Sequence, residues 1–95
     1  MTRTLDELRA LIDEIDQQLV ELISRRGEAA VEIGQAKAEL KRDILDSRRE
    51  DAVLSHVENA NPGPLSDDDL RRIFEALVAA CTAVQERGAD GAEGQ

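Results

Sequence analysis

The stretch LDELRALIDEIDQQLVELISRRGEAAVEIGQAKAEL, residues 5–40, decides the fold because its apolar residues recur every three or four positions. That spacing is typical of one face of an α-helix. Thr4 precedes the stretch as a candidate N-cap, and Glu7 stands where it would complete a capping box. At about 1.5 Å per residue, the helix would be roughly 50 Å long. A helix of that length needs an equally long partner for its apolar face, and the simplest partner is a second copy of itself.

A second helix is predicted over residues 46–59, with Asp46 or Ser47 as its cap. The segment NANPGPL, residues 59–65, follows it. Two prolines and a glycine within this segment cannot continue a helix, so the segment predicts a sharp break in the chain.

A third helix is predicted over residues 66–87, where Ser66 and Asp69 form a second candidate capping box. Its apolar face has the three- and four-residue spacing of a packed helix and consists of Leu70, Ile73, Phe74, Leu77, Val78, Cys81 and Val84. The fold class is therefore all-α. We expect one helical domain at residues 1–87 and a disordered acidic tail at residues 88–95.

Composition excludes several classes of function. The net charge of -9 argues against nucleic acid or an anionic membrane as the main partner. No apolar run approaches the roughly 20 residues of a membrane span, and no leader pattern opens the chain, so we expect a cytoplasmic protein. Cys81 and His56 are the only residues of their types, which excludes CxxC-type and histidine-rich metal sites. An activity without metal, cofactor or covalent nucleophile is expected.

Arg26 interrupts the apolar face of the first helix, at a position where the spacing calls for an apolar side chain. One interpretation is that a charge in the seam sets the register of paired helices. The alternative is a ligand site, because the neighbouring residues are small and leave space beside the cation. An unpaired buried charge costs several kcal/mol, so an anion would be expected to fill that space. The small neighbours are Gly27, Ala29, Ala30, Gly34 and Ala36.

Three further polar residues lie on or beside these apolar faces. Lys37 follows Arg26 by about three helical turns and points to roughly the same side. Arg9 stands at the start of the same face, so in an antiparallel pair of long helices it would approach the Arg26 and Lys37 of the other chain. Gln85 lies one turn after Cys81 on the third helix, where both ends of its amide need partners if it is buried. Taken singly, each also fits a solvated side chain or a fraying helix end.

The chain from about residue 5 to residue 87 resembles the all-helical class of chorismate mutases. The likeness rests on residues 8–37, on LDSRRE at residues 45–50 and on IFEALVAACTAVQ at residues 73–85. The segment NPGPLSDDDLRRIFEAL, residues 61–77, is most similar to the mutase domains associated with DAHP synthase. The resemblance implies an intertwined homodimer with the long helices paired. It also implies the conversion of chorismate to prephenate on the route to phenylalanine and tyrosine.

By motif position, the resemblance assigns Arg26 and the partner's Arg9 to the two carboxylates of the substrate. Guanidinium groups suit that task because each can bind a carboxylate in bidentate fashion. The resemblance further implies that Lys37 reaches a carboxylate and the ether oxygen, and that Gln85 is the second donor to that oxygen. The predicted catalytic set consists of Arg26, Lys37, Glu50 and Gln85, and Arg9 is predicted to bind substrate.

The resemblance also implies a second group of substrate-binding residues at the start of the second helix. Glu50 and the backbone near Asp46 correspond to the partners of the ring hydroxyl, and Arg49 supports the site. Cys81 stands where some relatives carry serine, and a thiol is the weaker hydrogen-bond donor. We therefore expect Cys81 to form a wall of the pocket.

Three other functions remain open from the sequence. An isochorismate pyruvate lyase would share the fold and a dicarboxylate substrate. A regulatory module would bind chorismate or prephenate and act on a DAHP synthase. A plain helical dimerisation module would use its seam charges only to set register, and Arg26→Leu would then stabilise the dimer.

Overall fold

The computed structural model describes residues 2–93 and contains three helices. α1 spans Leu5–Glu39, α2 spans Ser47–Ala60 and α3 spans Asp67–Glu93. The all-α prediction is confirmed for the described residues, and the start of each helix agrees with the predicted start to within one residue.

The end of α3 differs from the prediction. The helix was expected to stop near residue 87, but it continues through Gly88 to Glu93, so most of the segment predicted to be a disordered tail is helical. Gly88 is buried against α1, where an added Cβ would lie 2.5 Å from the carbonyl oxygen of Val31. Here glycine allows two helices to approach closely and does not end one. Residues 94 and 95 of the predicted tail lie outside the described residues.

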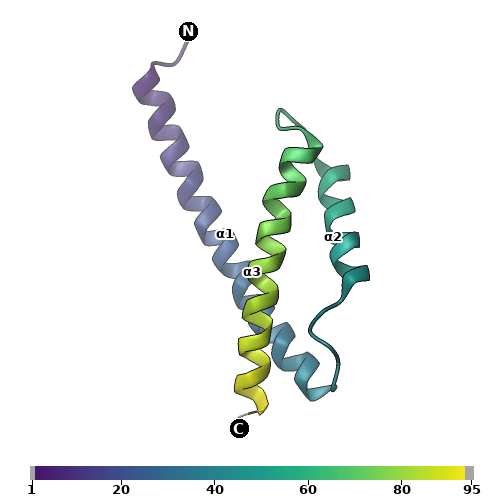
Figure 1. Cartoon of the computed structure of the whole chain (residues 1–95). Helices are drawn as coiled ribbons and strands as arrows, with labels where there is room; N and C mark the ends of the chain where they lie inside the picture. Colours follow the sequence, from purple (N-terminus) through teal and green to yellow (C-terminus); the bar gives the residue numbers. More distant parts are fainter. Residues whose placement is uncertain (1, 94–95) are drawn as a thin grey trace.

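α3 packs against both other helices (Figure 1). α1 and α3 cross in the C-terminal half of α1 and diverge toward the start of α1, so the N-terminal half of α1 stands away from the rest of the chain (Figure 1). The molecule is accordingly elongated, with extents of 58 × 26 × 14 Å. No helix within residues 2–93 has the length and apolar character needed to cross a membrane.

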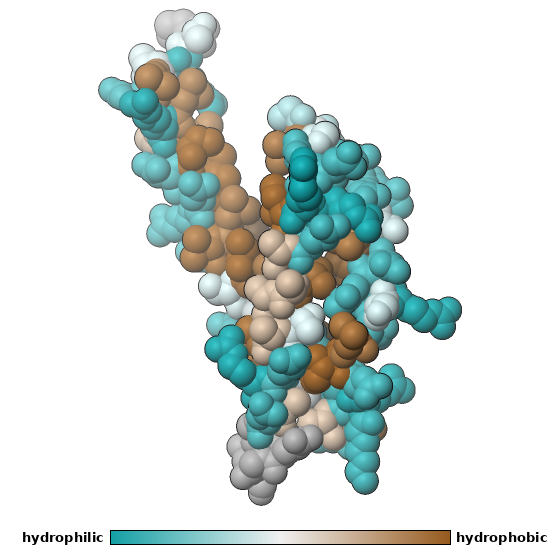
Figure 2. All heavy atoms as spheres, viewed as in Figure 1, coloured by the Kyte–Doolittle hydropathy of each residue, from teal (hydrophilic) through white to brown (hydrophobic). Residues whose placement is uncertain are grey.

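The buried core of the single chain is small. It consists of Ala30, Leu54, Cys81 and Ala89, together with the glycines at positions 34 and 88. Large apolar side chains of α1 lie instead along the gap that separates this helix from the α2–α3 pair, where Figure 2 shows a continuous apolar strip. These exposed residues are Leu5, Leu8, Ile12, Ile15, Leu19, Val20, Leu22 and Ile23.

Side-chain caps define the starts of the helices. The predicted capping box at α1 is confirmed, since the Glu7 amide donates to Thr4 Oγ1 at 3.1 Å and the Thr4 amide donates to Glu7 Oε1 at 3.4 Å. Asp46 caps α2 by accepting from the Arg49 amide at 3.1 Å. Ser66 accepts from the Asp69 amide at 3.1 Å at the start of α3. Such caps satisfy amide groups that have no partner within the helix.

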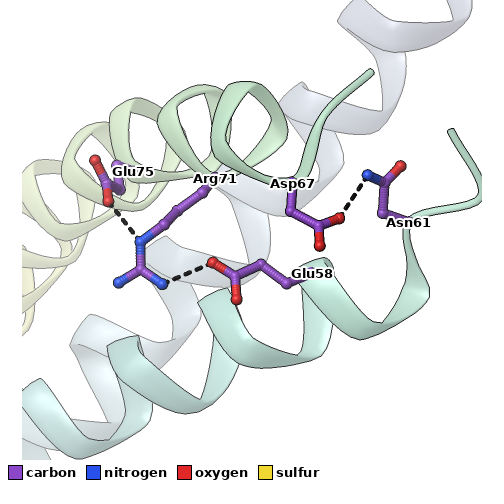
Figure 3. Close-up of polar contacts among 5 residues, drawn as sticks. All are labelled: Glu58, Asn61, Asp67, Arg71 and Glu75. Atoms are coloured by element: carbon purple, nitrogen blue, oxygen red, sulfur yellow. Dashed lines mark hydrogen bonds and ion pairs between the residues drawn. The ribbon is translucent and has the colours of Figure 1, made fainter. Parts of the chain in front are cut away.

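Polar contacts hold α2 against α3 at the end nearest the turn (Figure 3). Arg71 of α3 donates to Glu58 of α2 at 2.8 Å and to Glu75 of its own helix at 3.0 Å. These two carboxylates raise the pKa of the Arg71 guanidinium above its ordinary value. Within the turn, the side-chain nitrogen Nδ2 of Asn61 donates to Oδ1 of Asp67 at 2.8 Å. The contacts orient α2 so that its N-terminus, with Asp46, Arg49 and Glu50, reaches the middle of α3.

Candidate active site

A cavity of about 370 Å³ lies between the C-terminal half of α1, the N-terminal part of α2 and the middle of α3. The structure places every predicted site residue except Arg9 in the lining of this cavity. Those residues are Arg26, Lys37, Asp46, Arg49, Glu50, Cys81 and Gln85. Residues separated by up to 59 positions in sequence (from 26 to 85) are thus brought to one place by the packing of three helices.

Lys37 is held in a fixed position at the edge of the cavity. Its Nζ donates to the carbonyl oxygen of Ile44 at 2.7 Å and to Oε1 of Gln85 at 2.9 Å. An ammonium group has three protons to donate, so these two contacts leave one for a ligand. Because lysine has no acceptor, Gln85 presents its oxygen to Lys37 and keeps the donors of its amide nitrogen for another group. The pair therefore offers two adjacent hydrogen-bond donors to a single ligand atom.

A glycine allows this pair to form. Gly34 lies one turn before Lys37 on α1, and a Cβ there would lie 2.1 Å from the backbone oxygen of Gln85. Any larger residue would push α3 away from α1 at this point. Gly27, on the same helix, has no such neighbour within 4 Å. Gly34 thus sets the close approach of the two helices on which the Lys37–Gln85 contact depends.

Arg26 and Arg49 give the cavity further positive charge. Arg26 is half-buried, whereas its neighbour Arg25 is exposed and does not line the cavity. Among residues 2–93, the ion pairs join Arg71 to Glu58 and Glu75 and join Arg72 to Asp69. The two arginines of the cavity take no part in these ion pairs. They are placed to receive an anion.

Glu50 adds a carboxylate to the lining of the cavity. It is half-buried, and its Oε1 lies 3.4 Å from the hydroxyl oxygen of Thr82 on α3. Asp46 uses one side-chain oxygen to cap α2. Cys81 is 5% exposed and forms part of the wall, as expected. The cavity therefore combines cations for an anionic ligand with a carboxylate that can accept from a ligand hydroxyl.

Two contributors were missed from the sequence. Ile44 acts through its backbone carbonyl, for which no side-chain pattern gives a signal. Thr82 lies on α3 three residues before Gln85, a spacing that places the two on one side of the helix. That spacing could have identified Thr82 as a residue of the cavity.

Arg9 does not reach the cavity of its own chain. It is exposed on the first turns of α1, and the 17 residue steps from position 9 to position 26 correspond to about 25 Å of helix. Only a second chain could bring an Arg9 to this cavity. Among the described residues, no cluster of three or more His, Cys, Asp or Glu side chains is arranged to hold a metal ion.

Comparison with known proteins identifies relatives across most of the chain. The family model described as chorismate mutase type II matches residues 8–86. A bifunctional chorismate mutase/prephenate dehydratase of Neisseria gonorrhoeae is 35% identical over 89 residues, which cover 90% of this chain and 24% of that protein. The chain therefore spans about a quarter of the length of this relative. A chorismate mutase of Methanocaldococcus jannaschii is 28% identical, with 92% of this chain and 89% of that protein covered.

Solved structures show the same architecture. A structure of chorismate mutase (form II) from Thermus thermophilus superposes with a TM-score of 0.86 at 31% sequence identity. The match covers 87% of this chain and 94% of that chain.

Proposed function

The chain belongs to the chorismate mutase type II family, and we propose that its cavity converts chorismate to prephenate. The observation that carries the proposal is the Lys37–Gln85 pair, which lines the same cavity as Arg26 and Glu50. Chorismate has two carboxylates, a ring hydroxyl and an ether oxygen. The cavity offers a counterpart for one carboxylate, for the ring hydroxyl and for the ether oxygen, and the second carboxylate is assigned to an arginine of a partner chain.

The reaction needs geometry and charge stabilisation more than proton transfer. The C–O bond of the ether breaks while a C–C bond forms elsewhere in the same molecule, so no nucleophile or acid is consumed. The protein holds the substrate in its compact reactive conformer, which removes much of the entropic barrier. Electron density builds on the ether oxygen as its bond to carbon lengthens. The remaining proton of Lys37 and the amide N–H groups of Gln85 stabilise that density.

The carboxylates of the substrate are bound by Arg26 and by the partner's Arg9. This part of the proposal requires a homodimer in which the α1 helices pair in antiparallel fashion. Two observations support it: the large apolar residues of α1 are exposed in the single chain, and Arg9 lies about 25 Å along the helix from Arg26. A partner's α1 laid along the gap in Figure 2 would cover the apolar strip and deliver its Arg9 to the cavity.

Glu50 accepts from the ring hydroxyl, with the backbone near Asp46 as its neighbour. Arg49 adds positive charge beside the substrate, and Cys81 shapes the wall. Support for these roles is the position of all four residues in the cavity lining.

The experiment that tests the proposal follows the loss of chorismate by ultraviolet absorbance and identifies the product. We expect rapid formation of prephenate by the wild-type chain and a loss of roughly 10²–10³-fold for Arg26→Ala, because a group that binds and orients the substrate is removed. Arg25→Ala is the matched control, since Arg25 is adjacent but exposed and should leave turnover unchanged. A folded wild-type chain that leaves chorismate intact would overturn the proposal. Formation of pyruvate from isochorismate instead would favour the lyase.

We also propose a cytoplasmic location and a DAHP synthase as an associating enzyme. The single cysteine and the similarity of residues 61–77 to synthase-associated mutase domains support these proposals. Co-purification of the chain with a DAHP synthase from its own cell extract tests the association. Recovery with other enzymes only would contradict it.

A further inference from the structure

Thr82 is a cavity residue with one proton and two acceptors within reach. It is half-buried on α3, and its hydroxyl lies 3.0 Å from the carbonyl oxygen of Val78 and 3.4 Å from Oε1 of Glu50. A hydroxyl donates a single hydrogen bond, so the two acceptors compete for it.

The two acceptors differ in how much a hydrogen bond from the Thr82 hydroxyl would stabilise the protein. In an α-helix the carbonyl of Val78 already accepts from the backbone amide four residues later, which is the amide of Thr82 itself. A threonine hydroxyl directed at this carbonyl is a common resting arrangement that adds little stability. Glu50 is a carboxylate on another helix, and hydrogen bonds to ionised acceptors are roughly twice as strong as neutral ones. A small displacement of α2 toward α3 would transfer the hydroxyl to Glu50.

The Thr82–Glu50 contact lies where it can fix the position of α2 relative to α3 at the cavity. The ion pair of Arg71 with Glu58 holds α2 against α3 near the turn. Glu50 lies eight residues before Glu58, about 12 Å away along α2, at the end that forms the cavity. The Thr82 hydroxyl is thus positioned to donate a side-chain hydrogen bond from α3 to α2 at the cavity end.

We infer that Thr82 is a positioning residue for the ring hydroxyl of the substrate. Its hydroxyl donates to Oε1 of Glu50 and fixes the carboxylate so that the second oxygen, Oε2, faces the substrate hydroxyl. This inference rests on the proposed function, and it adds a residue that discriminates between substrates with and without that hydroxyl.

The test compares Thr82→Val and Thr82→Ser on two substrates, chorismate and a chorismate analogue that lacks the ring hydroxyl. Valine keeps the shape of threonine without a donor, whereas serine keeps the donor. For chorismate, we expect Thr82→Val to lower kcat/KM by roughly tenfold, the size of one hydrogen bond to a charged group. Thr82→Ser should stay close to wild type. For the analogue, the three proteins should have equal kcat/KM, because no ring hydroxyl is present to be oriented.

The outcomes separate this inference from the proposed function. If wild type does not convert chorismate, the proposed function fails and the inference fails with it. If wild type is active but Thr82→Val loses the same factor on both substrates, or on neither, only the inference is overturned. A loss confined to chorismate and rescued by serine supports it. Should Thr82→Val unfold, Thr82→Ala removes the same hydroxyl without a second branch on Cβ and gives the same comparison.

Discussion

The two halves of α1 differ in whether their apolar face is buried within the chain. In the packed half, residues 26–39, small residues lie against α3, and Ala30 is only 3% exposed. In the open half, residues 5–22, the face consists of large aliphatic residues, and Ile12 is 54% exposed. One continuous stripe in the sequence therefore serves two purposes. Small residues allow a close contact within the chain, whereas large ones remain available for another surface.

The difference explains where the cavity forms. Contact between the backbones of α1 and α3 at Gly34 leaves no room for large side chains, and the polar residues beside it meet across the crossing. The open half has no crossing helix of its own chain. Its exposed apolar strip is of the kind that marks an interaction surface in a protein of this size.

The largest effect is expected from a substitution that disrupts the apolar strip of the open half. Ile15→Glu places a charge in the apolar strip, where burying it against a partner would cost several kcal/mol. On the proposed homodimer, we expect a monomer, and turnover lower by roughly 10³-fold or more, because each cavity would lose the Arg9 that the partner is proposed to supply. Sedimentation measures the oligomeric state, and the chorismate assay measures the turnover. Gln17→Glu, which adds the same charge on the opposite face of α1, should leave the oligomeric state and the turnover as in wild type. A fully active monomer would refute the shared site.

A second large effect concerns the packed half. In Gln85→Glu, the carboxylate is ionised at pH 8 beside Lys37, so it accepts hydrogen bonds but cannot donate one to the ether oxygen. We expect turnover at pH 8 to fall by roughly 10²–10³-fold. Activity should recover as the pH falls toward about 4.3, the ordinary pKa of a glutamate carboxyl. Wild type should have a flat profile from mildly acidic to neutral pH. Unchanged activity of the variant at pH 8 would remove this role from Gln85.

The close crossing itself can be tested with glycine substitutions on one helix. Gly34→Ala would force α3 outward, because its Cβ would meet the Gln85 backbone at 2.1 Å. A displacement of about 1 Å in a catalytic group can cost roughly 10²-fold in rate. We expect that loss in kcat, accompanied by a lower melting temperature.

Gly27→Ala is the matched control for this crossing. The substitution meets no atom within 4 Å and should instead stabilise the helix by about 1 kcal/mol. Equal kcat values for the two variants would show that the close approach of α1 and α3 at Gly34 does not position the Lys37–Gln85 pair.

The smallest effect is expected at the exposed first turn of α3. Hydrogen bonds from Arg72 and Ser66, and the charge of Arg72, hold the pKa of Asp69 below its ordinary 3.8. The folded state therefore binds a proton less readily than the unfolded state. The stabilisation is fully present above pH 3.8 and is lost as the pH falls through the lowered pKa.

Asp69→Asn should accordingly lower the melting temperature slightly at about pH 7 and less at about pH 3. The difference should shrink in high salt, because the charges are exposed. A larger difference at the acidic pH than at the neutral one would contradict the sign of this linkage.

Much of the arrangement could be read from the sequence, because helix periodicity reports which residues share a face. Arg26 stood out by its charge within an apolar stripe, and Lys37, Glu50 and Gln85 joined it through motif positions. The structure brings these residues to one cavity, while their roles remain predictions.

Contacts made by the backbone could not be predicted in this way. The carbonyl of Ile44 holds Lys37, and the carbonyl of any residue would do the same if the loop placed it there. The predicted end of α3 was wrong for a related reason. Glycine commonly follows the end of a helix, but Gly88 serves as a contact for Val31.

By itself, the sequence determined three helices, their caps and the residues on each apolar face, because hydrogen bonds and side-chain periodicity within a helix are local. Only the tertiary structure decided which part of the α1 stripe is buried within the chain and which side chains meet across the cavity. Those outcomes depend on where two helices cross. Two glycines at the crossing, Gly34 and Gly88, allow backbones far apart in sequence to touch.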